Sequence, residues 1–85
     1  MTRLFADPHP ARLEWREGEL RALRVADRRW TVVEVVRRWR TEIEWWKKDG
    51  GVSRDHLTLR TADGTLCEVF GDRGTGDWYL QRLFD

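Results

Sequence analysis

Hydrophobic and polar residues alternate along much of the chain, with the period of two that is typical of half-buried β-strands. Leu20–Ala26 follows this pattern and offers one face for burial. Further along, His56–Thr61 and Thr65–Phe70 flank Ala62-Asp63-Gly64, and an Asp-Gly pair between two such runs is a strong signal for a β-hairpin. After a glycine-rich turn, Asp77–Phe84 has the composition of a final strand. The pattern therefore predicts short antiparallel strands joined by tight turns.

The segment Trp30–Arg40 is compatible with both a helix and a strand. Its composition favours a strand, because valine, threonine and tryptophan are enriched in sheets and no clean N-cap residue precedes it. A bulge near Glu34 reconciles the two patterns, since one extra residue shifts the alternation by one position. We therefore predict a bulged strand. The apolar residues at helical spacing are Val32, Val35, Val36 and Trp39.

Two more strands and an N-terminal arm complete the predicted fold. Ala11–Arg16 and Thr41–Trp46 both have strand-like composition. Residues 1–10 contain both prolines of the chain, which exclude a regular helix or a central strand. We expect an extended arm there and a single β domain over residues 11–85. Because each strand lies next to its sequence neighbour, the prediction is an all-β antiparallel meander of six or seven strands, curled into a barrel or half-barrel.

Composition limits the chain to one small domain and excludes several classes of protein. With 85 residues, of which 40% are hydrophobic and 36% charged, it is globular but densely charged. No apolar run reaches the ~18 residues of a membrane span, and the N-terminus lacks the apolar region of a secretory signal. Cys67 is the only cysteine, which excludes an internal disulfide and a CxxC motif. We expect a cytoplasmic protein with no cofactor and no membrane contact.

The strongest compositional signal is six tryptophans together with 14 arginines, two residue types enriched at binding hot spots. Trp45 and Trp46 are adjacent, so in a strand they point to opposite faces, and a sheet covered on one side cannot bury both. One of them must face solvent, a loop, a ligand or the arm around Phe5 and Pro8. Trp30 and Trp78 are best explained as core residues. The predicted binding surface comprises Arg37, Trp39, Arg40, Trp46, Lys47 and Lys48.

The partner that we favour for this surface is another protein, which makes the chain a non-enzymatic interaction module. A single-stranded nucleic acid is the alternative, because aromatic rings beside arginine and lysine form stacking platforms for unpaired bases. The net charge of only +1 argues against a general attraction to polyanions, although Leu20–Arg40 has seven arginines against two acids. An edge strand paired across a two-fold axis would also allow a homodimer.

Candidate catalytic and metal sites are weak. Cys67, with His56 as its base, would form a nucleophilic pair, but no orienting group or oxyanion hole accompanies it in the sequence. Asp7, His9 and His56 form a poor ligand set for zinc. We therefore expect no catalytic or metal-binding residue, and we interpret Cys67 as a small buried hydrophobic residue.

Two further patterns have ordinary structural explanations. Glu42 and Glu44 offer paired carboxylates, but alternating glutamates are common on the wet face of a strand, with Arg37 or Arg60 opposite. Gly71–Gly76 superficially suggests a phosphate-binding loop. It lacks the Lys-Ser/Thr ending of such a loop and precedes a strand, so we interpret it as a hairpin loop.

The order of aromatic and charged motifs from Leu23 to Asp85 resembles an uncharacterised small bacterial domain. That domain occurs alone, and it is similar to the C-terminal tail of ImuB-type inactive Y-family DNA-polymerase homologues. The resemblance implies no catalytic residues and suggests docking within a translesion-synthesis assembly. The sequence departs from the pattern where His56-Leu57 replaces an aromatic pair and where no Gly-Pro precedes Trp39. The matching motifs are Trp30-Thr31-Val32, Trp39-Arg40, Trp45-Trp46, Arg54-Asp55-His56-Leu57, Asp63-Gly64, Trp78-Tyr79-Leu80 and Phe84-Asp85.

Overall fold

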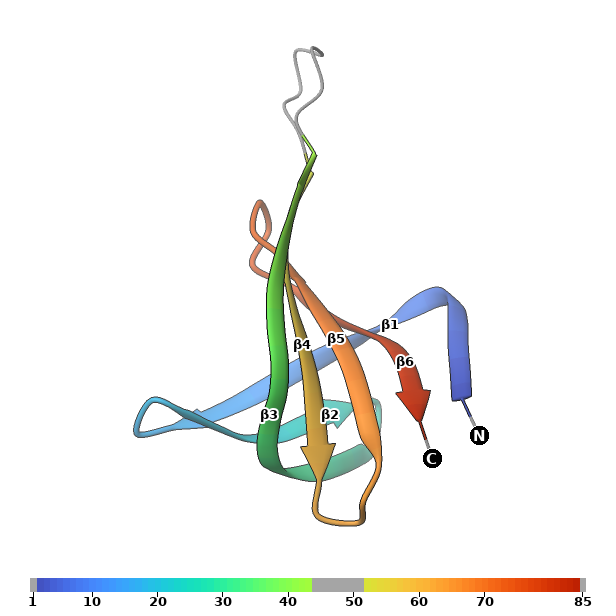
Figure 1. Ribbon diagram of the computed structural model, residues 1–85, viewed down its shortest axis with the longest axis vertical. Helices are drawn as coiled ribbons and strands as arrows, with labels where there is room; N and C mark the ends of the chain where they lie inside the picture. The colour runs from blue at the N-terminus through green and yellow to red at the C-terminus, as the bar shows by residue number, and fades with distance from the viewer. Residues whose placement is uncertain (1, 44–51, 85) are drawn as a thin grey trace.

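The computed structural model describes residues 2–43 and 52–84, and this part of the chain contains strands and turns but no helix. The strands pair in sequence order as an antiparallel meander, and the first also pairs with the last, which closes a small barrel (Figure 1). The predicted all-β class and barrel are confirmed. The six strands are β1 (Thr2–Arg16), β2 (Glu19–Val25), β3 (Arg28–Ile43), β4 (Val52–Thr61), β5 (Leu66–Asp72) and β6 (Trp78–Phe84).

Strand β1 changes its neighbour along its length. Residues 2–11 pair with β6, with one shift of register, and residues 12–16 pair with β2. Pro8 and Pro10 lie in the half that pairs on one side only, where a strand tolerates a missing N–H group. The segment expected to be an extended arm is extended, and it continues directly into the rest of β1.

Strand β3 contains two bulges. Its register against β4 shifts twice, and the extra residues are Val33 and Val36, which are 59% and 43% exposed. The first bulge lies beside Glu34, where it was predicted, while the second was not anticipated. Each extra residue moves the alternation by one position, which produces the helix-like spacing of the apolar residues. β3 runs on to Ile43 without a turn, so the prediction of a further strand starting at Thr41 is wrong.

The interior of the barrel is filled by apolar side chains from β2 to β6, with Ala11 and Leu13 of β1 packed against them. Trp30 is buried as predicted, whereas Trp78 is only partly buried and packs against the edge of the core. Cys67 is fully buried, in agreement with its interpretation as a small core residue. The core cluster comprises Leu20, Leu23, Trp30, Val32, Leu57, Leu59, Cys67, Val69, Leu80 and Leu83.

The turn between β4 and β5 is fixed by side-chain hydrogen bonds. The Thr61 hydroxyl donates to the carboxylate of Asp63, and the same carboxylate accepts a hydrogen bond from the backbone N–H of Thr65 at 3.1 Å. Gly64 follows with φ +89°, a backbone conformation that glycine adopts without strain. This is the hairpin that the Asp-Gly pair predicts.

Candidate functional site

The structure brings together two of the residues predicted to bind a partner. Arg37 and Trp39 lie on the outer face of β3, where the guanidinium carbon of Arg37 is 4.7 Å from the centre of the Trp39 ring. Arg40, one residue on, belongs to the opposite face, and its Nε donates a hydrogen bond to Oδ1 of Asp55 at 2.9 Å. The other three, Trp46, Lys47 and Lys48, lie outside the described residues.

Trp39 is the first ring of an aromatic column that crosses four adjacent strands of the barrel. Trp39 and His56 stack with centroids 4.9 Å apart and an interplanar angle of 6°. His56 and Phe70 follow at 6.1 Å and 38°, and Phe70 and Tyr79 at 5.2 Å and 26°. Each contact joins direct register partners, because these residues oppose one another across β3, β4, β5 and β6. We call Trp39, His56, Phe70 and Tyr79 the aromatic column.

The aromatic column lies on the outside of the barrel. Along β4 its member His56 alternates with Leu57, which points into the core, and along β5 Phe70 alternates with the core residue Val69. Phe70 is only 5% exposed, whereas Trp39 and Tyr79 are half-buried. Strands β4 and β5 therefore carry apolar packing on both faces, although the outer face of a small barrel is ordinarily polar.

Arginine side chains lie against the rings of the column. In addition to Arg37 on Trp39, the guanidinium carbon of Arg54 lies 4.6 Å from the centre of the Phe70 ring. Such cation–π contacts contribute about 0.5–1 kcal/mol each at exposed positions. Trp39 thus has His56 and Arg37 against its indole, so its ring surface is largely occupied by the protein itself.

His56 is the titratable member of the column. Both ring nitrogens are buried and, among the described residues, neither has a hydrogen-bond partner. Burial between the rings lowers the pKa of His56 below its ordinary value of 6.5, and Arg54 lowers it further, while Glu68 and Asp55 act in the opposite direction. The imidazole is therefore neutral at pH 7 and serves as an aromatic ring in the stack.

A shallow hollow of about 460 Å³ lies on the same outer surface, beside Trp39. Its apolar wall is formed by Val36 and by Leu66 and Phe84, which are register partners on β5 and β6. Arg82 completes the wall and contacts Glu68 at 3.9 Å. Together with the aromatic column, this hollow makes the outer surface of β3 to β6 a continuous mixture of aromatic, aliphatic and arginine side chains.

A second feature lies between the β1–β2 hairpin and β3, which diverge from each other in Figure 1. Two hollows, of about 500 and 970 Å³, share Trp15, which is 54% exposed. On the β3 side they are lined by Val33, Val35 and Arg38, and Trp78 forms part of the floor. We call the space between the hairpin and β3 the Trp15 groove.

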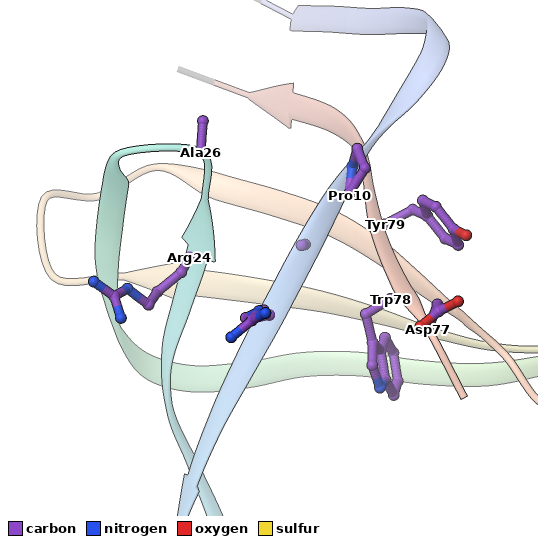
Figure 2. Close-up of a pocket in the computed structure, with 8 residues that line it drawn as sticks. Pro10, Arg24, Ala26, Asp77, Trp78 and Tyr79 are labelled. Carbon is purple, nitrogen blue, oxygen red and sulfur yellow. The ribbon is translucent and has the colours of Figure 1, made fainter. Parts of the chain in front are cut away.

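A third hollow, of about 660 Å³, lies where β1 crosses between β2 and β6 (Figure 2). Figure 2 shows Arg24 extending from β2 and Asp77 and Trp78 extending from the start of β6. Arg12 sits directly opposite Arg24 in the register of β1 and β2. The lining contains two guanidinium groups and one carboxylate but no cysteine, histidine or serine, so it offers a weakly basic surface.

The alternative chemical sites are not assembled by the fold. Cys67 points into the core beside Leu59, whereas His56 is on the outer face, so the two side chains lie on opposite sides of the sheet. Within residues 2–43 and 52–84, no group of three potential metal ligands comes together. Glu42 contacts Arg73 at 3.6 Å, so the predicted partners Arg37 and Arg60 are not its partners.

The glycine-rich segment after β5 is a hairpin loop, as predicted. The carboxylate of Asp72 accepts a hydrogen bond from the backbone N–H of Gly74 at 2.7 Å, and the Gly76 N–H donates to the Asp72 carbonyl oxygen at 2.7 Å. These contacts fold the segment onto itself and direct its N–H groups inward. Among the described residues, no helix is long and apolar enough to cross a membrane.

Several residues of the outer surface and of the groove were not predicted from the sequence. Phe70 and Tyr79 were assigned to strands, but their alignment with Trp39 depends on the registers of three strand pairs and on the second bulge in β3. Trp15 was placed in a strand without a role, although an exposed tryptophan next to a predicted turn is itself a signal for binding.

No family model, no curated protein and no solved structure matches the chain. The resemblance to the small bacterial domain therefore stays a prediction.

Proposed function

We propose that the chain is a non-enzymatic protein-interaction module that binds its partner through the outer surface of β3 to β6. The observation that supports this proposal most strongly is the aromatic column, because its end rings leave apolar surface on the outside of the barrel that a partner is able to bury. Trp39 and Tyr79 at its two ends are half-buried and available for further burial. Tryptophan, tyrosine and arginine are the residues that dominate protein interfaces energetically.

The surface charges support a protein partner over a nucleic acid. Seven arginines of the described chain form ion pairs with carboxylates, as in the pairs of Arg60 with Glu34 at 2.9 Å and of Arg24 and Arg29 with Glu14 at 3.6 and 3.3 Å. Interspersed charges of both signs suit a protein surface, whereas a polyphosphate chain prefers a continuous basic track.

Single-stranded nucleic acid is the second candidate, and the contacts of Arg37 with Trp39 and of Arg54 with Phe70 favour it. In nucleic-acid-binding barrels, however, bases stack on free ring faces. Here His56 and Arg37 already lie against the Trp39 indole, so less of that ring is free for a base. Oligonucleotide titration tests this candidate, which requires quenching of tryptophan fluorescence and an affinity that falls steeply with salt.

From the resemblance to polymerase-associated tails we propose that the partner belongs to a translesion-synthesis assembly, to which the chain would be an accessory in bacterial DNA-damage tolerance. This part of the proposal rests on the motif order alone and is tested by the identity of the captured partner.

The test of the module is affinity capture from a lysate of the source organism with immobilised protein. Trp39→Ala and Tyr79→Ala should each abolish capture of the specific partner, while far-UV circular dichroism and a cooperative urea transition show that the barrel remains folded under the assay conditions. Arg73→Ala is the matched control, because Arg73 is an exposed residue of the loop between β5 and β6 and lies outside the aromatic column and the hollows described above. If the two ring variants capture the same proteins as the parent, the outer surface is not the binding site.

A further inference from the structure

The ring of strand pairings leaves one strand edge open. β2 pairs with β3 only at Arg28 to Thr31, and beyond Thr31 β3 pairs with β4 alone. No strand of the described chain covers the other edge of β3 from Val33 to Ile43. An uncovered edge presents a row of N–H and C=O groups that another extended chain is able to complete.

The accessible part of this edge has a regular geometry. The bulges at Val33 and Val36 interrupt the first part, and bulges are one of the ways in which proteins prevent unwanted pairing at an edge. From Arg37 to Ile43, however, each residue of β3 opposes one residue of β4 without a further shift. The edge is therefore protected from pairing at Val33–Val36, where it is bulged, and is regular from Arg37 to Ile43, where the arginines lie.

The Trp15 groove runs alongside this edge. Trp15 lines both hollows between the β1–β2 hairpin and β3, and Val35, Arg38 and Trp78 also line the hollow of about 500 Å³. A strand added to β3 would place its alternate side chains on two surfaces: the Trp15 groove on the inner side, and the outer side that carries Arg37 and Trp39. Such an occupant meets both apolar and cationic groups.

The positive charge of the arginines on β3 favours an acidic occupant. Arg37 and Arg38 are exposed, and neither forms an ion pair with any residue in 2–43 or 52–84. Arg40 adds a third guanidinium within four residues, although Asp55 partly neutralises it at 2.9 Å. Carboxylates on either face of an added strand would meet one of these arginines, and desolvated pairs of this kind raise specificity and association rate.

We propose that the Arg37–Ile43 edge of β3 accepts an extended acidic peptide segment of a partner protein as an additional β-strand, with its apolar side chains against Trp15. This inference rests on the proposed interaction function and specifies how the partner is held. A second copy of the chain is disfavoured, because antiparallel self-pairing about Trp39 would place Arg38 opposite Arg40 of the other copy, pairing about Arg40 would place Arg40 opposite itself, and like charges opposite each other destabilise a sheet. A nucleic acid is disfavoured because phosphates accept hydrogen bonds but do not donate them to the C=O groups of the edge.

The probe is a synthetic octapeptide with blocked ends, glutamate on one face and valine on the other. Its binding to ¹⁵N-labelled protein is followed by amide chemical shifts and compared with that of the same peptide carrying lysine in place of glutamate. We expect the largest shifts at the amides of Arg37–Ile43 and at the Trp15 indole, and an affinity at least about tenfold higher for the acidic peptide. Equal affinities, or shifts confined to the aromatic column, would overturn the proposal.

Backbone methylation provides the decisive control. Two further acidic peptides carry N-methyl groups on alternate residues, one set on the odd and the other on the even amides. Because alternate amides of a strand face the same neighbour, one set should abolish binding and the other should leave it within about twofold. Equal binding of both sets, or equal loss, contradicts strand addition.

Charge reversal tests the arginines. Arg37→Glu, on the outer face that the glutamates of the probe would occupy, should weaken binding of the acidic peptide by about tenfold and strengthen binding of the lysine peptide. Arg60→Glu, on the outer face of β4, should change neither affinity by more than about twofold. If oligo(dT) shifts the Arg37–Ile43 amides at lower concentration than the acidic peptide, the occupant is a nucleic acid. If the free protein sediments as a dimer with these amides protected, it is a second copy. If no peptide binds while Trp39→Ala still abolishes partner capture, strand addition fails and the interaction function stands.

Discussion

The indole of Trp78 lies across Gly71 of the neighbouring strand, and a Cβ atom added to Gly71 would fall 2.8 Å from that ring. Gly71 itself is buried, and its φ does not require glycine, so space alone determines the residue at this position. Trp78 thereby reaches the edge of the core through a gap that a side chain on β5 would close.

Substitution of Gly71 by alanine should therefore destabilise the barrel. We expect a loss of about 1–3 kcal/mol in the free energy of unfolding, because the ring must move and loses its packing against the core. Urea unfolding of the Gly71→Ala, Trp78→Ala and doubly substituted proteins, compared with the parent, measures the coupling between the two positions. The cost should fall markedly when the indole is absent, and an unchanged cost would mean that the clash lies elsewhere.

Ala26 occupies a turn position where glycine is the better residue. Its φ is +55°, in the left-handed region, where a Cβ atom is unfavourable. We expect Ala26→Gly to raise the free energy of unfolding by up to about 1 kcal/mol. Ala62→Gly, at an exposed turn position without a positive φ, is the matched control and should lower stability slightly. Equal effects of the two substitutions would contradict this explanation.

The lowered pKa of His56 makes stability depend on pH. The unfolded chain binds a proton at His56 near pH 6.5, whereas the folded protein binds it only at lower pH, so the unfolded state holds more protons between these values. The free energy of unfolding should be fully retained above about pH 6.5 and should decrease as the pH falls below it. Urea unfolding between pH 7.5 and 5.5 measures this slope. His56→Phe, which keeps a ring in the column, should remove the His56 contribution, and an unchanged slope would assign it to other groups.

The thiol of Cys67 should be unreactive toward thiol reagents in the folded protein. Its side chain is fully buried in the barrel core between β4 and β6. A thiol reagent should therefore react only as fast as the barrel opens, and immediately in urea above the unfolding midpoint. Reaction of the native protein at the rate of a free thiol would contradict the core assignment and would reopen a role for this cysteine.

The elements that were predictable from the sequence are those determined by local chemistry. The Asp63-Gly64 turn and the strands around it follow from turn residues and alternation, and they are present in the structure. The bulge beside Glu34 was predictable because it shifts the alternation of the valines by one position. The second bulge, at Val36, has the same effect, but a single extra residue was sufficient to explain the observed spacing of the valines.

The candidate site depends on relationships that no local pattern contains. Trp39, His56, Phe70 and Tyr79 are separated along the chain, and they form a column only because three independent registers agree. A change of one residue in any of these registers would turn a ring to the other face. The same holds for Trp15, whose groove exists because the β1–β2 hairpin diverges from β3 after Thr31.

The change of neighbour within β1 has a consequence for the order in which the barrel folds. Every other pairing joins strands that follow each other in sequence, so these hairpins form at a small entropic cost of loop closure. The pairing of β1 with β6, by contrast, joins Thr2 to Phe84 and requires almost the whole chain to be ordered first. The seam between these two strands should therefore close last during folding and open first during unfolding. Hydrogen exchange at the Ala11 amide and at the amide of its β6 partner Trp78 would then report on the least protected pairing of the barrel.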